Sequence, residues 1–152
     1  MKFSILLFTS ILLLSGCLGE TNAALGETSK YGDLKSSYSE GHAEILMTTD
    51  KELYSPGEAI TVQFENKGEA AAGYGAALYL EKRDGDSWRK VPYEDLSFTS
   101  ESLSLSASSS EEQELPLEYI EGSLTDGTYR ITKSFSVHSE NVVLAAFFEV
   151  SE

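Results

Sequence analysis

The sequence is poor in cysteine and in basic residues, and each shortage excludes a class of protein. A single cysteine among 152 residues excludes an intrachain disulfide, so the hydrophobic core alone has to hold a fold together. The sequence has 11 Lys and Arg residues and 25 Asp and Glu residues, which gives a formal net charge of −14. This balance argues against nucleic acid as a partner, because phosphate binding depends on clustered Lys and Arg. We interpret the charge as serving solubility and spacing from anionic surfaces, in preference to a dedicated site for cationic ligands.

Residues that carry catalysis or bind metals are equally scarce. The two histidines, His42 and His138, have no Cys or Asp neighbours at metal-ligand spacing, and we predict that both lie on the surface. Residues 84–87 carry two carboxylates, but they lack the rest of a calcium-binding loop and are predicted to form a turn. No serine stands in a G-x-S-x-G motif. We therefore expect no catalytic residue, no metal and no cofactor, and a protein that is not an enzyme.

Only one long apolar run is present, at residues 3–14, directly after a lysine. About 12 apolar residues suit the core of an export signal and are too few to cross a bilayer, which needs about 20. Small residues and the single cysteine complete the stretch, as Leu14, Ser15, Gly16 and Cys17. This stretch resembles a lipobox, the signature of bacterial lipoproteins.

The lipobox resemblance implies that residues 1–16 are a signal peptide. Cleavage then leaves Cys17 as the first residue, with a diacylglyceryl group on its sulfur and palmitate-like acyl chains in the bilayer. Two acyl chains hold a protein stably on a membrane, whereas one binds only marginally. We therefore expect a lipid-anchored protein on the extracytoplasmic face of the cell membrane. An ordinary secreted protein with a spare thiol is the alternative.

Residues 17–42 are predicted to form a flexible tether between the lipidated cysteine and a folded domain. They are rich in Gly, Ser, Thr, Asn and Ala and show no clear periodicity. A flexible coil of about 24 residues spans roughly 25–30 Å. A docked arm or a transient helix is the alternative, because a few large side chains recur at loosely helical spacing: Leu25, Tyr31, Leu34 and Tyr38.

Short alternating runs separated by turns fill residues 43–152 and predict a single all-β domain. The clearest run, at 60–66, alternates Ile60, Val62 and Phe64 with polar residues, as a half-buried strand does. Roughly seven or eight short strands and no convincing helix favour an antiparallel β-sandwich. The other strands are predicted at 44–48, 74–82, 88–91, 114–118, 124–131 and 142–150, with one or two more between 96 and 105.

Several motifs of this domain, taken in order, resemble a bacterial immunoglobulin-like domain that is common in small lipoproteins of Gram-positive bacteria. The likeness covers about residues 44–150. It implies an immunoglobulin-like β-sandwich, preceded here by the signal peptide and tether, that is usually non-catalytic. The motifs are Tyr54-Ser55-Pro56-Gly57 before Ile60, Tyr74-Gly75, Leu80-Glu81-Lys82, Gly85 before Trp88, Val91-Pro92, Leu124, Gly127-x-Tyr129-Arg130-Ile131 and Phe148-Glu149-Val150.

A few side chains of the predicted sandwich have distinctive positions. Tyr129 stands where a tyrosine corner would bond nearby backbone, and Trp88 is predicted to cover one end of the core. Lys133 is predicted to lie on the same face of its strand as core residues. Either its side chain extends to solvent at the rim of the sandwich, or a bulge shifts the register of the strand. On the last strand, three residues are predicted to face away from the core: Val143, Ala145 and Phe147. They form a possible binding strip, unless a loop or extra strand covers them.

These features predict a membrane-anchored extracytoplasmic lipoprotein whose immunoglobulin-like domain is a non-catalytic binding module. Its expected partners are the lipid bilayer, through Cys17, and an envelope protein or polymer that it recognises through loops or an edge strand. The alternative is a regulator or inhibitor of an envelope protease or sensor. For that role the Ser-rich residues 97–110 are the natural inserting loop.

Overall fold

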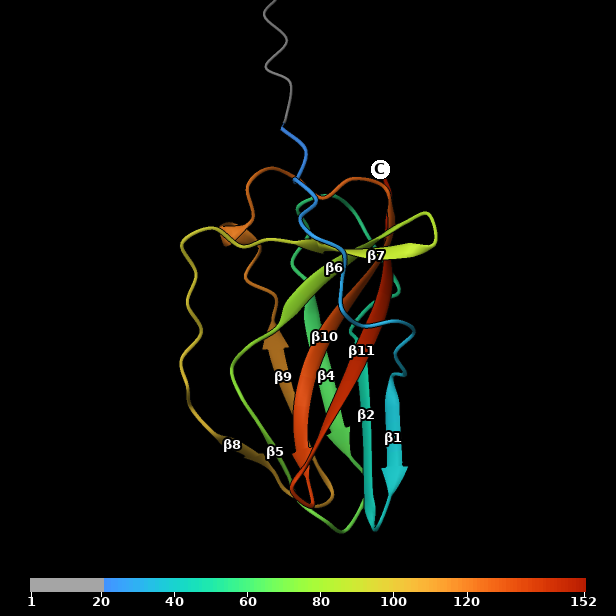
Figure 1. Ribbon diagram of the computed structural model, residues 1–152, viewed down its shortest axis with the longest axis vertical. Helices are drawn as coiled ribbons and strands as arrows, with labels where there is room; N and C mark the ends of the chain where they lie inside the picture. Colours follow the sequence, from blue (N-terminus) through green and yellow to red (C-terminus); the bar gives the residue numbers. More distant parts are fainter. Residues whose placement is uncertain (1–20) are drawn as a thin grey trace, which may run out of the picture.

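The computed structural model describes residues 21–152, which form two β-sheets packed face to face (Figure 1). The predicted signal peptide and Cys17 lie outside the described residues. Within the described part, no helix is long and apolar enough to cross a membrane. The helical content of that part is a single 3₁₀ turn, η1 (Leu117–Tyr119), beside eleven strands. The prediction of an all-β sandwich is therefore confirmed.

The first sheet contains four strands in the order β1-β2-β4-β9, each antiparallel to its neighbour. Their bounds are β1 (Ser37–Glu40), β2 (Ala43–Thr49), β4 (Thr61–Asn66) and β9 (Ser109–Glu114). Strand β4 confirms the run predicted at 60–66. The strand predicted at 114–118 is wrong, because β9 ends at Glu114 and the chain continues through Pro116 into η1. Proline has no backbone N–H to donate to a sheet, and here it ends the pairing.

The second sheet is built around the long hairpin of β10 (Gly127–Val137) and β11 (Glu140–Val150), which pair over their full length. The other edge of β10 pairs with β6 (Tyr79–Asp84) and with β5 (Ala72–Tyr74). The single strand predicted at 74–82 is thus two strands, because residues 75–78 leave the sheet. Strand β7 (Ser87–Val91) pairs with β6, β8 (Leu103–Leu105) pairs with β5, and β3 (Leu53–Tyr54) pairs in parallel with β11.

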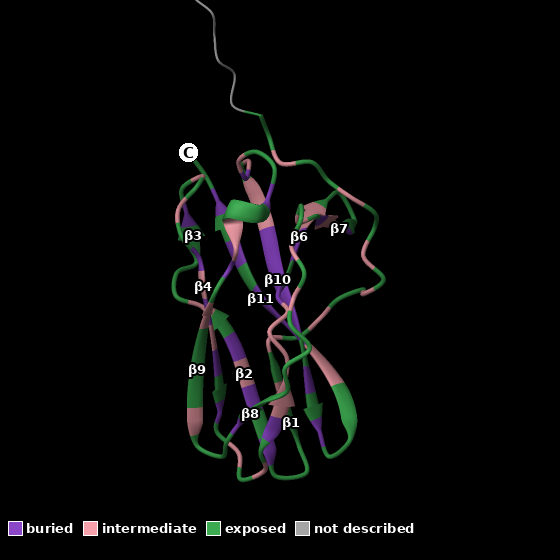
Figure 2. Cartoon of the chain, turned by 90° about the vertical axis from the view of Figure 1, so that its left-hand side faces the viewer, coloured by how far each residue is buried: buried purple, intermediate pink, exposed green. Residues whose placement is uncertain are grey.

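Alternating side chains from both sheets meet in one core. Figure 2 shows the buried residues on strands of both sheets. A strand sends successive side chains to opposite faces, so every second residue of β4 and β10 faces the other sheet. Burying these apolar side chains is the main favourable contribution to folding. Fully enclosed members include Ile45, Met47, Val62 and Phe64 from the first sheet, and Leu80, Ile131, Phe135 and Leu144 from the second.

Tyr129 forms the predicted tyrosine corner at the start of β10. Its hydroxyl donates a hydrogen bond to the carbonyl oxygen of Thr125 (2.8 Å) and accepts one from the N–H of the same residue (3.1 Å). The ring stacks on Phe148 with a centroid distance of 5.5 Å. The corner thereby fixes the turn that leads into the central hairpin.

Lys133 is enclosed between the sheets, and neither of its two predicted arrangements is found. Its pairing with Leu144 is in continuous register, so no bulge occurs, and the residue is 2% exposed. The ammonium group donates to the carbonyls of Gly75 (2.7 Å) and Ala77 (3.3 Å) and to Oε1 of Gln113 (2.8 Å) on β9. These bonds join the two sheets and hold the segment 75–78 outside the second sheet. Burial lowers the pKa of Lys133 to about 8.

We predict that the free energy of unfolding rises between about pH 8 and pH 10 because of Lys133. In this window the folded chain releases the proton that the unfolded chain still holds, since a free lysine has a pKa of about 10.4. The unfolded state therefore binds more protons, and stability increases with pH, by up to about 3 kcal/mol for a shift of this size. Denaturant unfolding at successive pH values measures the rise. The Lys133→Met variant should show a flat profile, and an equal rise in that variant would refute the assignment.

Candidate functional site

The segment of residues 21–36, here called the N-terminal arm, lies along the outside of the second sheet (Figure 1). Part of it follows the free edge of β7 as an added strand would. The N–H of Gly26 donates to the carbonyl of Lys90 and the N–H of Ser29 to that of Trp88, both at 2.7 Å. In return, the N–H of Lys90 donates to the carbonyl of Glu27 at 3.0 Å. The arm thus covers an edge that would otherwise present unpaired backbone groups.

A buried arginine binds the arm from beneath. Arg130 on β10 is 0% exposed, and its Nε donates to Oε2 of Glu81 at 2.6 Å. Its other nitrogens donate to the carbonyls of Gly32 (2.7 Å) and Tyr31 (3.2 Å), while the ring of Trp88 lies 4.4 Å from the guanidinium carbon. A buried charge is tolerated only when it is paired and hydrogen-bonded. The arm carbonyls complete that set, so the arm belongs to the fold.

The described part of the predicted tether is therefore not a free coil. Residues 21–36 form the docked arm that the sequence left as an alternative, and residues 37–40 form β1, which pairs with β2. The expected domain boundary at residue 43 falls inside this hairpin. The arm is held because arginine side chains of β7 and β10 donate hydrogen bonds to its backbone carbonyls. Such binding does not require an apolar pattern in the arm, so the sequence pattern did not reveal it.

The arm covers the middle of the predicted binding strip. Ala145 is fully buried, and its N–H donates to the carbonyl of Lys35 at 3.0 Å. Val143 is half-buried, whereas Phe147 is 40% exposed and packs against Trp88 at a centroid distance of 5.9 Å. The three residues therefore do not form one continuous exposed strip.

Trp88 lies on the outer face of the second sheet, so the prediction that it covers an end of the core is wrong. Hairpin register pairs Trp88 with Arg83, and both side chains point away from the first sheet. The indole is instead enclosed by the guanidinium groups of Arg83 and Arg130 and by Phe147. A single tryptophan beneath the arm is a natural fluorescence probe of whether the arm is bound.

Aromatic side chains line a hollow of about 570 Å³ beside the arm, which we call the aromatic hollow. Its rings are Tyr79 at the start of β6 and Tyr93 and Phe98 from the segment that follows β7. The ring of Phe98 meets Tyr79 edge to face at 5.8 Å and Tyr93 at 5.7 Å. Tyr79 is 55% exposed, so its ring is open to a ligand. The remaining lining comes from Gly26, Glu27, Leu80, Lys90, Val91, Pro92, Leu96 and Ser97.

Tyr93 carries an unpaired polar atom in this part of the molecule. Its hydroxyl is buried and has no hydrogen-bond partner among the described residues. Burial raises the pKa of Tyr93, with smaller contributions from Tyr79 and from the carboxylate of Glu118. An unpaired buried hydroxyl costs free energy. Because the protein encloses this hydroxyl, Tyr93 offers a ligand in the hollow its ring and not its oxygen.

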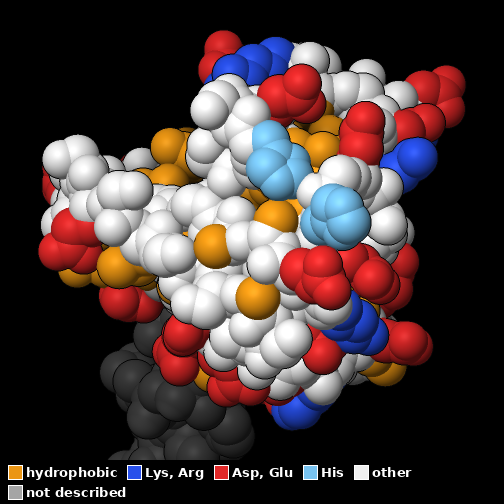
Figure 3. Space-filling view, turned by 90° about the horizontal axis from the view of Figure 1, so that it is seen from below, with side chains coloured by type: hydrophobic (Ala, Val, Ile, Leu, Met, Phe, Trp, Pro, Cys, Tyr) orange, Lys and Arg blue, Asp and Glu red, His pale blue; other side chains and the backbone are white. Residues whose placement is uncertain are grey.

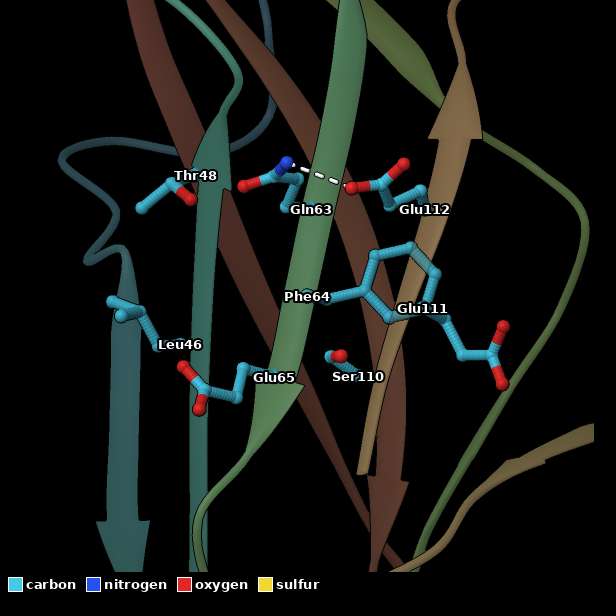
Figure 4. Close-up of a pocket in the computed structure, with 8 residues that line it drawn as sticks. All are labelled: Leu46, Thr48, Gln63, Phe64, Glu65, Ser110, Glu111 and Glu112. Carbon is cyan, nitrogen blue, oxygen red and sulfur yellow. Dashed lines mark hydrogen bonds between the residues drawn. The ribbon is translucent and has the colours of Figure 1, made fainter. Parts of the chain in front are cut away.

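A second hollow, of about 300 Å³, lies on the outer face of the first sheet (Figure 4). Apart from the partly exposed Leu46, its surface side chains are polar or acidic, and Gln63 Nε2 donates to Glu112 Oε1 at 2.8 Å. The one ring beside it, that of Phe64, is 1% exposed and belongs to the core. The acidic residues of β9 are exposed, as expected for a solvated edge. We therefore regard the aromatic hollow as the better candidate site.

Both histidines lie at the lower end of the sandwich, where Figure 3 shows them on the surface. His42 Nδ1 is 3.4 Å from Oε2 of Glu69, and both side chains are almost fully solvent-accessible. His138 is exposed at the tip of the β10–β11 hairpin. Residues 21–152 contain no group of three or more His, Cys, Asp or Glu side chains that could hold a metal ion.

The two facing sheets, the tyrosine corner and the missing disulfide define an immunoglobulin-like sandwich of the disulfide-free kind. A sequence profile described as a bacterial Ig-like domain matches residues 41–149, and the chain belongs to this family. The predicted resemblance is thereby confirmed. A search of curated proteins found no match.

Solved structures show only distant likenesses. A β-glucosidase from Listeria innocua is 20% identical over 76% of this chain, which corresponds to 17% of the glucosidase, with a TM-score of 0.37. The alkylpurine DNA glycosylase AlkC from Pseudomonas fluorescens is 14% identical over 73% of this chain and 31% of its own, with a TM-score of 0.40. The putative ApaA protein from Bordetella pertussis is 15% identical over 78% of this chain and 93% of its own, at 0.37. At these scores the likenesses carry no argument about function.

Proposed function

We propose that the protein is a lipid-anchored binding module on the extracytoplasmic face of the cell membrane, and that it holds its partner in the aromatic hollow without catalysing a reaction. The hollow carries this proposal. Its volume of about 570 Å³ is within the usual range of ligand sites, and exposed aromatic rings are the side chains that most often anchor binding partners. Membership of the bacterial Ig-like family supports an interaction role.

The lipid anchor rests on the lipobox-like Leu14-Ser15-Gly16-Cys17, which lies outside the described residues. The arm begins at residue 21, four residues after Cys17. Four residues reach at most about 14 Å even when fully extended. An acylated Cys17 would therefore hold the upper end of the sandwich close to the membrane, nearer than the 25–30 Å expected for a free coil.

The alternative role, inhibition through an inserting loop at 97–110, is the weaker proposal. Phe98 packs between Tyr79 and Tyr93, so the start of the segment is held against the domain. Further along, residues 103–105 form β8, and β9 begins at residue 109. The segment therefore offers little free loop for insertion into a protease.

Affinity capture from solubilised host membranes tests the proposed site. We expect the wild-type protein to retain an envelope partner that the Tyr79→Ala variant loses, because truncating an exposed aromatic anchor costs more than 1 kcal/mol at many interfaces, about a fivefold or larger drop. Leu53→Ala is the matched control, since Leu53 is 59% exposed on β3, away from the hollow. Equal retention by the Tyr79 variant would contradict the proposal. A captured peptidase whose activity falls on binding would favour the inhibitor instead.

A further inference from the structure

Acidic side chains lie near the aromatic hollow, and its one lining cation is already paired. Lys90 Nζ forms an ion pair with Glu27 at the rim. On the other side, the N–H of Glu94 donates to the carbonyl of Tyr119 at 2.7 Å, which ties the segment after β7 to η1. The carboxylate of Glu121 lies beside that of Glu94 and raises the pKa of Glu94 by repulsion between like charges. Acidic side chains therefore lie beside the segment that carries Tyr93, one of the lining residues.

The aromatic rings of the hollow suit a positively charged group. The faces of tyrosine and phenylalanine rings attract ammonium and guanidinium groups. Tyr79 and Phe98 meet edge to face, so their faces point in different directions around the hollow.

We propose that the aromatic hollow binds a segment of a protein partner that carries lysine or arginine side chains. This inference rests on the proposed function and names the chemistry of its ligand. A hollow of about 570 Å³ is much larger than one ammonium group needs, and it can take more than one side chain of an extended peptide. The net charge of −14 would steer such a partner from a distance. In this proposal the negative charge attracts the partner as well as keeping the protein soluble. Composition alone had favoured solubility over a site for cationic ligands.

Titration of the full lipoprotein in nonionic detergent with capped tetrapeptides tests the ligand class. The probes are tetra-lysine and tetra-arginine, with tetra-glutamine as the uncharged control and tetramethylammonium as a small cation. Binding is followed by calorimetry and by NMR shifts of the aromatic side chains. We expect the basic peptides to shift Tyr79, Tyr93 and Phe98, and to bind more weakly as salt screens the charges. Tyr79→Ala should weaken binding about fivefold, as loss of one cation–π contact predicts, and Leu53→Ala should leave it unchanged.

Three results would overturn the inference, each in a distinct way. Equal binding of tetra-glutamine at the same rings would reject the cationic ligand while leaving the hollow as a binding site. Tetramethylammonium binding as tightly as tetra-lysine would assign the hollow to a small cation instead of a peptide. Basic peptides that shift only residues outside the hollow, or that bind the Tyr79→Ala variant equally well, would show general attraction to an acidic surface.

Discussion

Replacing Arg130 by methionine should lower the free energy of unfolding by about 3–5 kcal/mol, the usual cost of breaking a buried ion pair by removing one partner. Glu81, 2% exposed, would be left as a buried carboxylate without its partner. The carbonyls of Tyr31 and Gly32 would lose their donors in the same step. We therefore expect the arm to detach, the Trp88 emission to shift to the red, and trypsin to cleave rapidly after Lys30 and Lys35.

Two further variants separate the ion pair from general disruption. In the double variant Arg130→Met with Glu81→Leu, no unpaired charge remains, so much of the lost stability should return while the arm stays loose. Arg83→Met is the matched control, because its guanidinium also lies over Trp88, at 5.3 Å, yet Arg83 is only partly buried. We expect that control to cost less than about 1 kcal/mol. Slow trypsin cleavage of the arm in Arg130→Met would contradict the role given to Arg130.

Replacing Cys17 by serine should release the protein from the membrane fraction almost completely. The two acyl chains of a diacylglyceryl group provide about 0.8 kcal/mol for each buried methylene, and serine cannot carry them through sulfur. Fractionation of host cells with detection of the protein in membrane and soluble fractions measures the effect. Ser15→Ala is the control, since it keeps a small residue before the cysteine. Retention of Cys17→Ser in the membrane, or a free thiol at Cys17 in protein from its host, would reject the anchor.

The fold could be predicted because the sequence signals for it come from residues that are close together along the chain. Strand β4 alternates Ile60, Val62 and Phe64 with polar residues, and period-2 alternation is the direct consequence of strand geometry. The tyrosine corner is likewise readable, since Tyr129 and its partner Thr125 lie four residues apart. Strand β9 was missed because its Ser- and Glu-rich sequence carries no apolar alternation.

The arm and the aromatic hollow could not be predicted because their contacts are non-local. Arg130 binds carbonyls of Tyr31 and Gly32, nearly a hundred residues earlier, and a carbonyl acceptor leaves no trace in the sequence. Trp88 looked like a core residue, yet the hairpin register turns it outward toward buried charge. The hollow needs β6, the segment after β7 and the arm together, and only the aromatic residues at 79, 93 and 98 hinted at it.

Site-specific photo-crosslinking in the native membrane tests most directly whether the aromatic hollow binds a partner. A benzophenone amino acid replaces Tyr79 in one variant and Leu53 in the control, both exposed positions on different strands of the second sheet. We predict one dominant adduct from position 79 with an extracytoplasmic protein that has a basic segment, reduced by excess tetra-lysine, and no such adduct from position 53. The absence of an adduct at 79, or the same adducts from both positions, would contradict the proposed site.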